Sequence, residues 1–160
     1  MSGWNPNVTR SKAYLTFVGN LVDGVFKGSY LSLSFLKIYG PYIDREMFWH
    51  SVEAGGIINN SNLIIAGDLN FTLTDANIWG AKTQMDPMDD FFMQMLLKKN
   101  LVDVAPAKIG PTWRNGRAGE YEISKHLDTF IVAEYLVLSM DRHRLWTISF
   151  SISNQLTICF

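Results

Sequence analysis

Cysteine is nearly absent from this chain of 160 residues, and it has no long apolar run and no excess of positive charge. The single cysteine, Cys159, excludes an internal disulfide, and the N-terminus lacks the basic and then apolar pattern of a secretory signal. No apolar run approaches the roughly 20 residues that cross a bilayer. These absences predict an intracellular protein without a membrane-spanning segment.

The charges of the chain are almost balanced. There are 14 lysines and arginines against 15 acidic residues, so the formal net charge is −1. A nearly neutral protein has no general attraction for nucleic acid, and phosphate binding must therefore depend on local basic clusters. Hydrophobic residues make up 48% and aromatic residues 13% of the chain, which predicts one globular domain with a sizeable core.

The first part of the chain contains one clear strand. Residues 1–29 show no hydrophobic period, and we leave them unassigned. From Tyr30 the segment YLSLSFLKIYG alternates apolar and small polar residues until Gly40 and Pro41 interrupt it. The alternation predicts a strand with one side formed by Leu31, Leu33, Phe35 and Lys37.

Helical and buried-strand patterns follow. Asp44 is placed to cap a helix that runs to about Glu53, and Ile43 and Phe48 have the spacing of a hydrophobic staple. Residues 63–66 form a short apolar run typical of a buried strand. After Pro87, residues 88–99 have helical spacing, with acids first and lysines last.

The remainder of the chain has strand-like patterns. We predict strands over 111–113, 127–132, 146–150 and 156–160, with a hairpin-type turn at Asn115-Gly116. Early strands separated by helices and later hairpins indicate an α/β fold with a mixed sheet.

Asp68 and Asn70 directly follow the predicted buried strand, in the segment GDLN. Ligands bind at the carboxyl ends of strands in α/β sheets, and a spacing of two places both side chains on one side of an extended chain. A carboxylate can orient an attacking water while an amide donates to a phosphate oxygen. Taken alone, a Gly-Asp pair at a strand end is more often an ordinary turn.

Several short segments extend this observation. In order along the chain they are IYGPY, an acid-capped helix containing FW, IIAGDLN, DDFFMQMLLKKNLVDV, GPTWRNGR and HLDTFIVAE. Together they resemble the endonuclease/exonuclease/phosphatase superfamily over residues 30–160. The TWRNGR segment, followed by I-x-x-x-LD-x-F-x-V, is similar to the nuclease domain of LINE-type retrotransposons.

The resemblance implies a four-layered α/β sandwich that lacks its first strands, so that 30–160 would be a partial domain. It also implies hydrolysis of phosphodiester bonds with Mg²⁺, with DNA as the substrate and the nucleus as a location. Tyr39 would lie near the scissile phosphate, Asp68 would position the attacking water, and Asn70 would contact the phosphate. Asp128 would match the acid that orients a terminal catalytic histidine.

The TWRNGR segment is the local basic and aromatic feature of the chain. Guanidinium groups match phosphate oxygens in geometry, so we predict nucleic-acid contacts here. The candidate residues are Trp113, Arg114, Asn115 and Arg117. The alternative is a hairpin that only faces solvent.

Two departures from the family pattern predict impaired catalysis. The family ends with Ser-Asp-His, whereas this chain has Ser153, Asn154 and Gln155, so amides replace the metal-binding acid and the catalytic histidine. A positioned acid-base group is worth about 10² to 10⁴ in rate. The family's upstream metal-binding glutamate also has no match in the 29 residues before Tyr30, which leaves Asp68 as the remaining metal ligand.

Three functions are therefore open at this point. The first is a phosphodiesterase with impaired or no activity, so the sequence alone does not decide whether the chain is an enzyme. The second is a non-catalytic nucleic-acid-binding or protein-binding module, or a decayed retrotransposon remnant. The third is a phosphatase acting on inositol lipids, against which the resemblance of TWRNGR argues.

Overall fold

The computed structural model of the chain describes residues 7, 9–27, 31–80, 86–106, 108–139, 146–149 and 156–159. A six-stranded sheet forms its centre, in the order β1-β2-β3-β4-β9-β6. The strands are β1 (Thr9–Leu15), β2 (Gly19–Phe26), β3 (Ser32–Tyr39), β4 (Leu63–Asp68), β6 (Leu101–Asp103) and β9 (Asp128–Ala133). β3 and β4 are parallel, and the other neighbours are antiparallel.

Residues 1–29, which sequence patterns leave unassigned, contribute β1 and β2 to the sheet. The two strands form a hairpin in which Leu15 pairs with Asn20, and β2 then pairs with β3. β3 therefore has a partner on both sides, and β1 lies at the edge.

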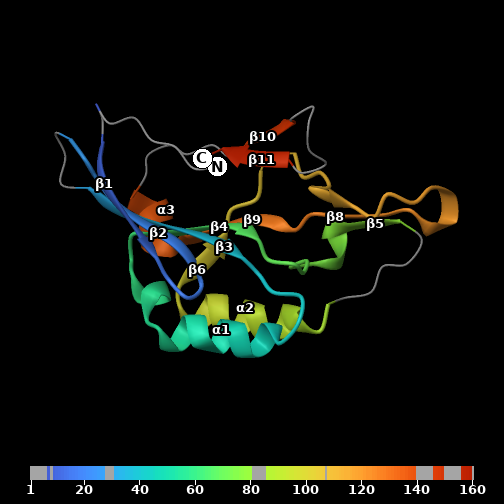
Figure 1. The fold of residues 1–160 in the computed structure, drawn as a ribbon, viewed down its shortest axis with the longest axis horizontal. Helices are drawn as coiled ribbons and strands as arrows, with labels where there is room; N and C mark the ends of the chain where they lie inside the picture. Colours follow the sequence, from blue (N-terminus) through green and yellow to red (C-terminus); the bar gives the residue numbers. More distant parts are fainter. Residues whose placement is uncertain are drawn as a thin grey trace.

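The two faces of the sheet are covered differently. Helices α1 (Arg45–Ala54) and α2 (Met88–Lys98) lie together on one face, whereas α3 (Glu134–Ser139), β10 (Trp146–Ser149) and β11 (Leu156–Cys159) lie on the other (Figure 1). The side chains of Ser34, Leu36 and Ile38 in β3 are buried, and those of Lys37 and Tyr39 are exposed. We conclude that α1 and α2 cover the Leu36 face, while the alternate residues of β3 face the opposite side.

β3 has the predicted alternation, but the side formed by Leu33, Phe35 and Lys37 is the less buried one. Leu33 and Phe35 are only partly buried, and Leu31 is exposed. Ser34 is buried instead, because its hydroxyl donates to Asp23 Oδ1 at 2.6 Å and accepts from the Asn60 side-chain amide at 2.8 Å. A buried polar group that has such partners does not carry a large desolvation cost.

Aromatic side chains join the helices to the chain that follows β4. Trp49 of α1 packs edge-on against Phe92 of α2 with ring centroids 4.6 Å apart, and Phe71 lies 5.0 Å from Phe92. All three side chains are fully buried. Edge-on aromatic pairs add about 0.5–1.5 kcal/mol each beyond the burial of their area. This cluster therefore stabilises the packing of α1 and α2 against the chain that follows β4.

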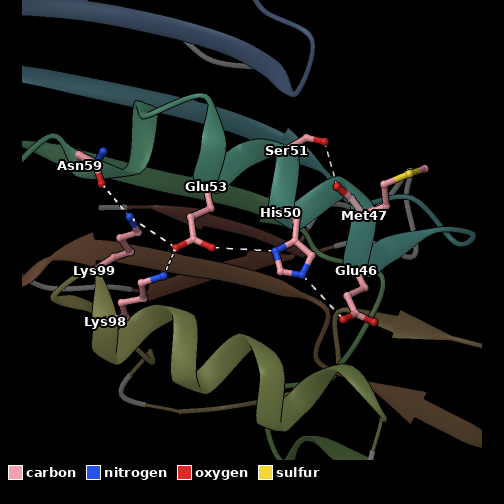
Figure 2. Close-up of polar contacts among 8 residues, drawn as sticks. All are labelled: Glu46, Met47, His50, Ser51, Glu53, Asn59, Lys98 and Lys99. Atoms are coloured by element: carbon pink, nitrogen blue, oxygen red, sulfur yellow. Dashed lines mark hydrogen bonds and ion pairs between the residues drawn. The ribbon is translucent and has the colours of Figure 1, made fainter.

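Charged side chains join α1 to α2 at their surface. Figure 2 shows Glu53 of α1 in contact with Lys98 at the end of α2 and with Lys99, which follows it; Glu53 Oε1 lies 2.7 Å from Lys98 Nζ and 3.5 Å from Lys99 Nζ. The hydrogen bond from Lys98 is the largest cause that lowers the pKa of Glu53. The contact links the two helices at their surface, where an ion pair adds little stability.

The predicted helices are confirmed, but the start of α1 differs in detail. Asp44 occupies the N-cap position with φ 55°, and its side chain makes no capping hydrogen bond within the described residues. Ile43 is 77% exposed, so it does not form the buried staple with Phe48. The backbone oxygen of Asp44 instead accepts the first helical bond, from Phe48 at 3.0 Å.

A second, three-stranded sheet lies beyond one end of the first (Figure 1). It has the order β5-β8-β7, with β5 (Ile78–Gly80), β7 (Trp113–Arg114) and β8 (Ile123–Lys125). Gly116 has φ 69°, but the connection between β7 and β8 continues to Glu122 through the short helix η3 (Gly119–Tyr121). The turn at Asn115-Gly116 is therefore the start of a long hairpin loop and not the whole of it.

Two further short helices complete the chain, η1 (Ile57–Asn59) and η2 (Asp75–Asn77). The predicted strands that end at residues 150 and 160 are confirmed as β10 and β11, which pair antiparallel. Among the described residues, no helix is long and apolar enough to cross a membrane.

Candidate active site

Three strands end side by side and place Tyr39, Asp68 and Asp128 in one row. Tyr39 pairs with Asp68 across the parallel strands β3 and β4, and Asp68 pairs with Asp128 across the antiparallel strands β4 and β9. Paired residues of adjacent strands project from the same face of a sheet. The three side chains therefore share the face opposite α1 and α2, as the sequence-based site requires.

Glycine at position 40 allows the end of β3 to approach the chain after β4. The Gly40 N–H donates to the backbone oxygen of Asp68 at 2.7 Å, and the Asn70 side-chain amide donates to the Gly40 oxygen. A Cβ atom at position 40 would lie 2.2 Å from the Leu69 oxygen. Only glycine fits this approach, which fixes Tyr39 relative to Asp68.

Asn70 is held in a left-handed backbone conformation with φ 57°. Its backbone N–H donates to Asp68 Oδ1 at 2.8 Å, which orients the carboxyl group. The side-chain oxygen of Asn70 is buried and has no hydrogen-bond partner in the part of the chain that the structure describes. A buried acceptor without a partner is costly, so this atom indicates a place for a donor or a cation.

Thr112 fixes the position of Asp128. Its hydroxyl oxygen accepts the backbone N–H groups of Leu127 and Asp128 at 2.9 and 3.1 Å, and its side chain is fully buried. A hydrogen bond from Thr112 to the Asp128 carboxylate favours the ionised acid. Sequence reasoning missed Thr112, although it directly precedes Trp113 in the GPTW motif.

Burial makes both carboxyl groups resist ionisation. The pKa of Asp128 is raised to about 6, mainly by burial and to a smaller extent by the charge of Asp68, while the hydrogen bond from Thr112 lowers it. Burial also raises the pKa of Asp68, against the lowering effect of the Asn70 N–H. A positive charge placed between the two groups would relieve both effects.

The residues of the row fit a hard divalent cation. Two carboxyl groups and the unpartnered Asn70 oxygen are the ligand types that Mg²⁺ prefers, and Mg²⁺ usually keeps several waters. Within the described residues, no group of three or more His, Cys, Asp or Glu side chains is arranged to hold a metal. Asp68 and Asp128 are the two carboxylates that the row could offer to a cation.

A second tyrosine, Tyr42, lies close to Tyr39. Tyr42 follows the Gly40-Pro41 turn and is 69% exposed, and Tyr39 is 59% exposed. A hydrogen bond with Tyr39 is the largest cause that raises the pKa of Tyr42, and the Asp68 charge adds to it. Sequence reasoning missed Tyr42, whose signal was its place three residues after Tyr39.

Arg45 supports the loop from the helix side. Its Nη1 atom forms an ion pair with Asp86 Oδ2 at 2.7 Å and donates to the Asn70 backbone oxygen at 3.4 Å. The start of α1 is thereby tied to the segment that carries Asn70.

His126 is buried two residues before Asp128, and its side chain contacts the chain that leads into β7. Its Nδ1 lies 2.8 Å from the Gly110 oxygen, and burial lowers its pKa. The neutral imidazole therefore joins β8 to the chain before β7, and no proton-transfer role is needed to explain it.

The predicted nucleic-acid residues lie on β7 and the hairpin loop. Arg114 and Arg117 are exposed, and Trp113 is partly buried. Asn115 uses both side-chain atoms inside the loop, because its amide donates to the Tyr121 oxygen at 2.8 Å and its oxygen accepts from Ile123 at 3.2 Å. Asn115 therefore shapes the loop, and the two arginines remain available to a ligand. Asn154 and Gln155 lie outside the described residues.

The arrangement of these elements is similar to that of a solved nuclease structure. The endonuclease domain of TRAS1, a telomere-specific non-LTR retrotransposon, superposes with a TM-score of 0.69 over 97% of this chain and 68% of that chain, at 16% sequence identity. The chain has the fold of that endonuclease domain. The likeness confirms the predicted α/β fold class and the resemblance to the LINE-type nuclease domain. No protein-family model matches the chain, and no curated protein matches it.

Proposed function

We propose that the chain is a Mg²⁺-dependent phosphodiester hydrolase of the DNA endonuclease type whose activity is impaired. The observation that carries the proposal is the row of Tyr39, Asp68 and Asp128, with the unpartnered oxygen of Asn70 beside it. The fold shared with the TRAS1 endonuclease domain supports the proposal. If DNA is the substrate, the nucleus is the expected location in a cell that has one.

The side chains suggest a division of roles. The ionised Asp68 orients a water molecule and accepts its proton as the water oxygen attacks phosphorus, and one ester oxygen leaves. The Tyr39 hydroxyl and the Asn70 amide would contact the phosphate oxygens. Bound Mg²⁺ would supply positive charge to the phosphate, with Asp68, Asp128 and Asn70 as its protein ligands.

The weak step is protonation of the leaving oxygen. In the family pattern a histidine follows the last aspartate, whereas this chain has Asn154 and Gln155. A neutral amide has no titratable proton to give. We therefore expect a rate lower by about 10² to 10⁴ than that of a site with the acid-base pair.

Plasmid nicking tests the proposal directly. With Mg²⁺, we expect the unmodified chain to convert supercoiled DNA slowly to nicked circles. We expect Asp68→Ala to convert none. The exposed Asp90→Ala on α2 is the control for loss of an acidic residue. The double variant Asn154→Asp, Gln155→His should nick faster by about 10² or more. If all four proteins fail to nick, a DNA-nicking hydrolase is excluded.

A non-catalytic nucleic-acid-binding module is the second candidate, because both residues of the missing acid-base pair are amides. Such a module binds DNA with an affinity that falls steeply with salt, and it leaves the DNA intact. A decayed remnant of a retrotransposon would show neither binding nor cleavage. The nicking assay and a binding assay together separate the three outcomes.

A further inference from the structure

Lys37 lies on the same face of the sheet as the row of acids. It is two residues before Tyr39 on β3, so both side chains project to the face opposite α1 and α2. Lys37 pairs with Ala66 of β4, and Asp68 is the next β4 residue on that face. Diagonal neighbours in a sheet have Cβ atoms about 7–8 Å apart, a span that a lysine side chain can cross.

The surroundings of Lys37 leave its side chain free to move toward the acids. Its partners in register are Ala66 on one side and Asn20 on the other, and neither carries a charge. Ala66, which lies between Lys37 and Asp68 on this face, is small and apolar, and it is buried. Lys37 is exposed, so a change of its rotamer disrupts no packing.

The charge of Lys37 is also unpaired. Within the described residues, Lys98, Lys99 and Arg45 each have a carboxylate within 4.0 Å, and Lys37 has none. Arg45, which approaches the site from the helix side, is neutralised by Asp86 at 2.7 Å. A phosphate bound at the row of acids therefore lies beside two carboxyl groups. Among the described residues, Lys37 is the cation on this face of the sheet that can offset their negative charge.

We propose that Lys37 binds a backbone phosphate of the nucleic acid beside Tyr39 and Asp68, which extends the site along β3. The inference rests on the proposed function, since it names a further residue that holds the same substrate. Lys37 is a positioning residue because it contributes charge and does not take part in proton transfer. A lysine binds phosphate as a mobile point charge, which suits a side chain that must reach across Ala66.

Salt-dependent binding of a labelled DNA duplex tests the assignment. The full chain and its variants are titrated without divalent metal at several KCl concentrations, and log K is plotted against log [KCl]. Loss of one phosphate contact should reduce the slope by about 1 and weaken binding roughly equally for unrelated sequences. We expect this result for Lys37→Ala, and recovery of the slope in Lys37→Arg.

Lys12→Ala is the matched control. Lys12 is an exposed strand lysine that pairs with Asp23, which pairs with Ser34, so it projects to the opposite face. Lys12→Ala should leave the slope unchanged, and far-ultraviolet circular dichroism should show that all variants are folded. If the chain binds DNA and Lys37→Ala has the slope of Lys12→Ala, the role of Lys37 is wrong while the proposed function stands. If the unmodified chain binds no DNA at any salt concentration but nicks plasmid with Mg²⁺, the role of Lys37 is wrong and the proposed function stands; if it neither binds nor nicks, both are wrong.

Discussion

The ends of β3, β4 and β9 and the hairpin between β7 and β8 are built in opposite ways. At the strand ends, Asp68 is 7% exposed and Thr112 is fully buried, and close backbone contacts hold each residue. In the hairpin, Tyr121 is 70% exposed, and a Cβ atom at Gly116 would meet nothing within 4 Å. Groups that need a fixed geometry are on the rigid strands, and groups that can adapt to a ligand are on the open loop.

Replacing one glycine in each region should give the largest difference. Gly67 of β4 has φ 147°, and a Cβ atom there would lie 1.9 Å from the Ile38 oxygen. Because backbone cannot move aside as a flexible side chain can, Gly67→Ala should lower the free energy of unfolding by about 3 kcal/mol or more, or prevent folding. Urea denaturation followed by circular dichroism measures the change.

Gly116→Ala is the counterpart in the hairpin. Gly116 has φ 69° with open space around it, so alanine there costs only the left-handed conformation, about 1–2 kcal/mol. Equal losses in the two variants would show that the strand ends are no more constrained than the loop.

The next largest effect is expected at Thr112. Thr112→Val removes the acceptor of the buried N–H group of Leu127 and of the partly buried N–H group of Asp128, and it should cost about 2–3 kcal/mol. Thr112→Ser keeps the hydroxyl and should recover part of the loss. Thr129 is a matched control, since its hydroxyl is buried without a partner in the described residues, and Thr129→Val should be neutral or stabilising. A large loss in Thr129→Val and none in Thr112→Val would contradict this account.

The sequence predicted β4 and β9 well because both sides of each strand are buried, which gives nearly continuous apolar runs. The apolar run 63–66 and the segment HLDTFIVAE correspond to β4 and β9, and their register unites Asp68 with Asp128. The β1–β2 hairpin was not predicted, because most of its residues are at least partly exposed on both faces and so carry no period-2 pattern.

Contacts between distant residues account for the rest of what was missed. Ser34 can be buried because it forms hydrogen bonds with Asp23 and Asn60, and no local sequence pattern predicts partners so distant along the chain. Thr112 likewise acts on Leu127 and Asp128, which are brought to it by the pairing of β7 with β8. Such tertiary hydrogen bonds decide which polar residues of a strand are inside.

The pH dependence of stability should report on Asp128. Burial raises the pKa of Asp128 from 3.8 to about 6, so the folded chain keeps this proton to a higher pH than the unfolded chain. Stability is therefore lost as the pH rises from about 4 to about 6. Asp128→Asn mimics the protonated acid, and it should be more stable than the unmodified chain by about 1–2 kcal/mol at pH 7.5 and equal to it near pH 4.

Thermal melting of the two proteins across this pH range measures the difference. Asp90→Asn on the exposed side of α2 controls for the change in net charge. A gain that is the same at pH 4 and pH 7.5 would mean that burial of the carboxylate is not its source. The variant should lose nicking activity as it gains stability, since the buried charge that destabilises the fold is the one that the site requires.

The smallest effect on stability and a clear effect on binding are expected in the hairpin. Arg114 and Arg117 are exposed and form no ion pair within the described residues, so Arg114→Ala and Arg117→Ala should each change the free energy of unfolding by less than about 0.5 kcal/mol. If they contact DNA phosphates, each substitution should lower the slope of log K against log salt by about 1.

Asn115→Ala should instead weaken binding by releasing the loop, because it loses the bonds to Tyr121 and Ile123 and removes no charge. Its salt slope should therefore stay unchanged. If all three variants keep the slope of the unmodified chain, the two arginines do not contact the nucleic acid. Recognition would then be confined to the strand ends.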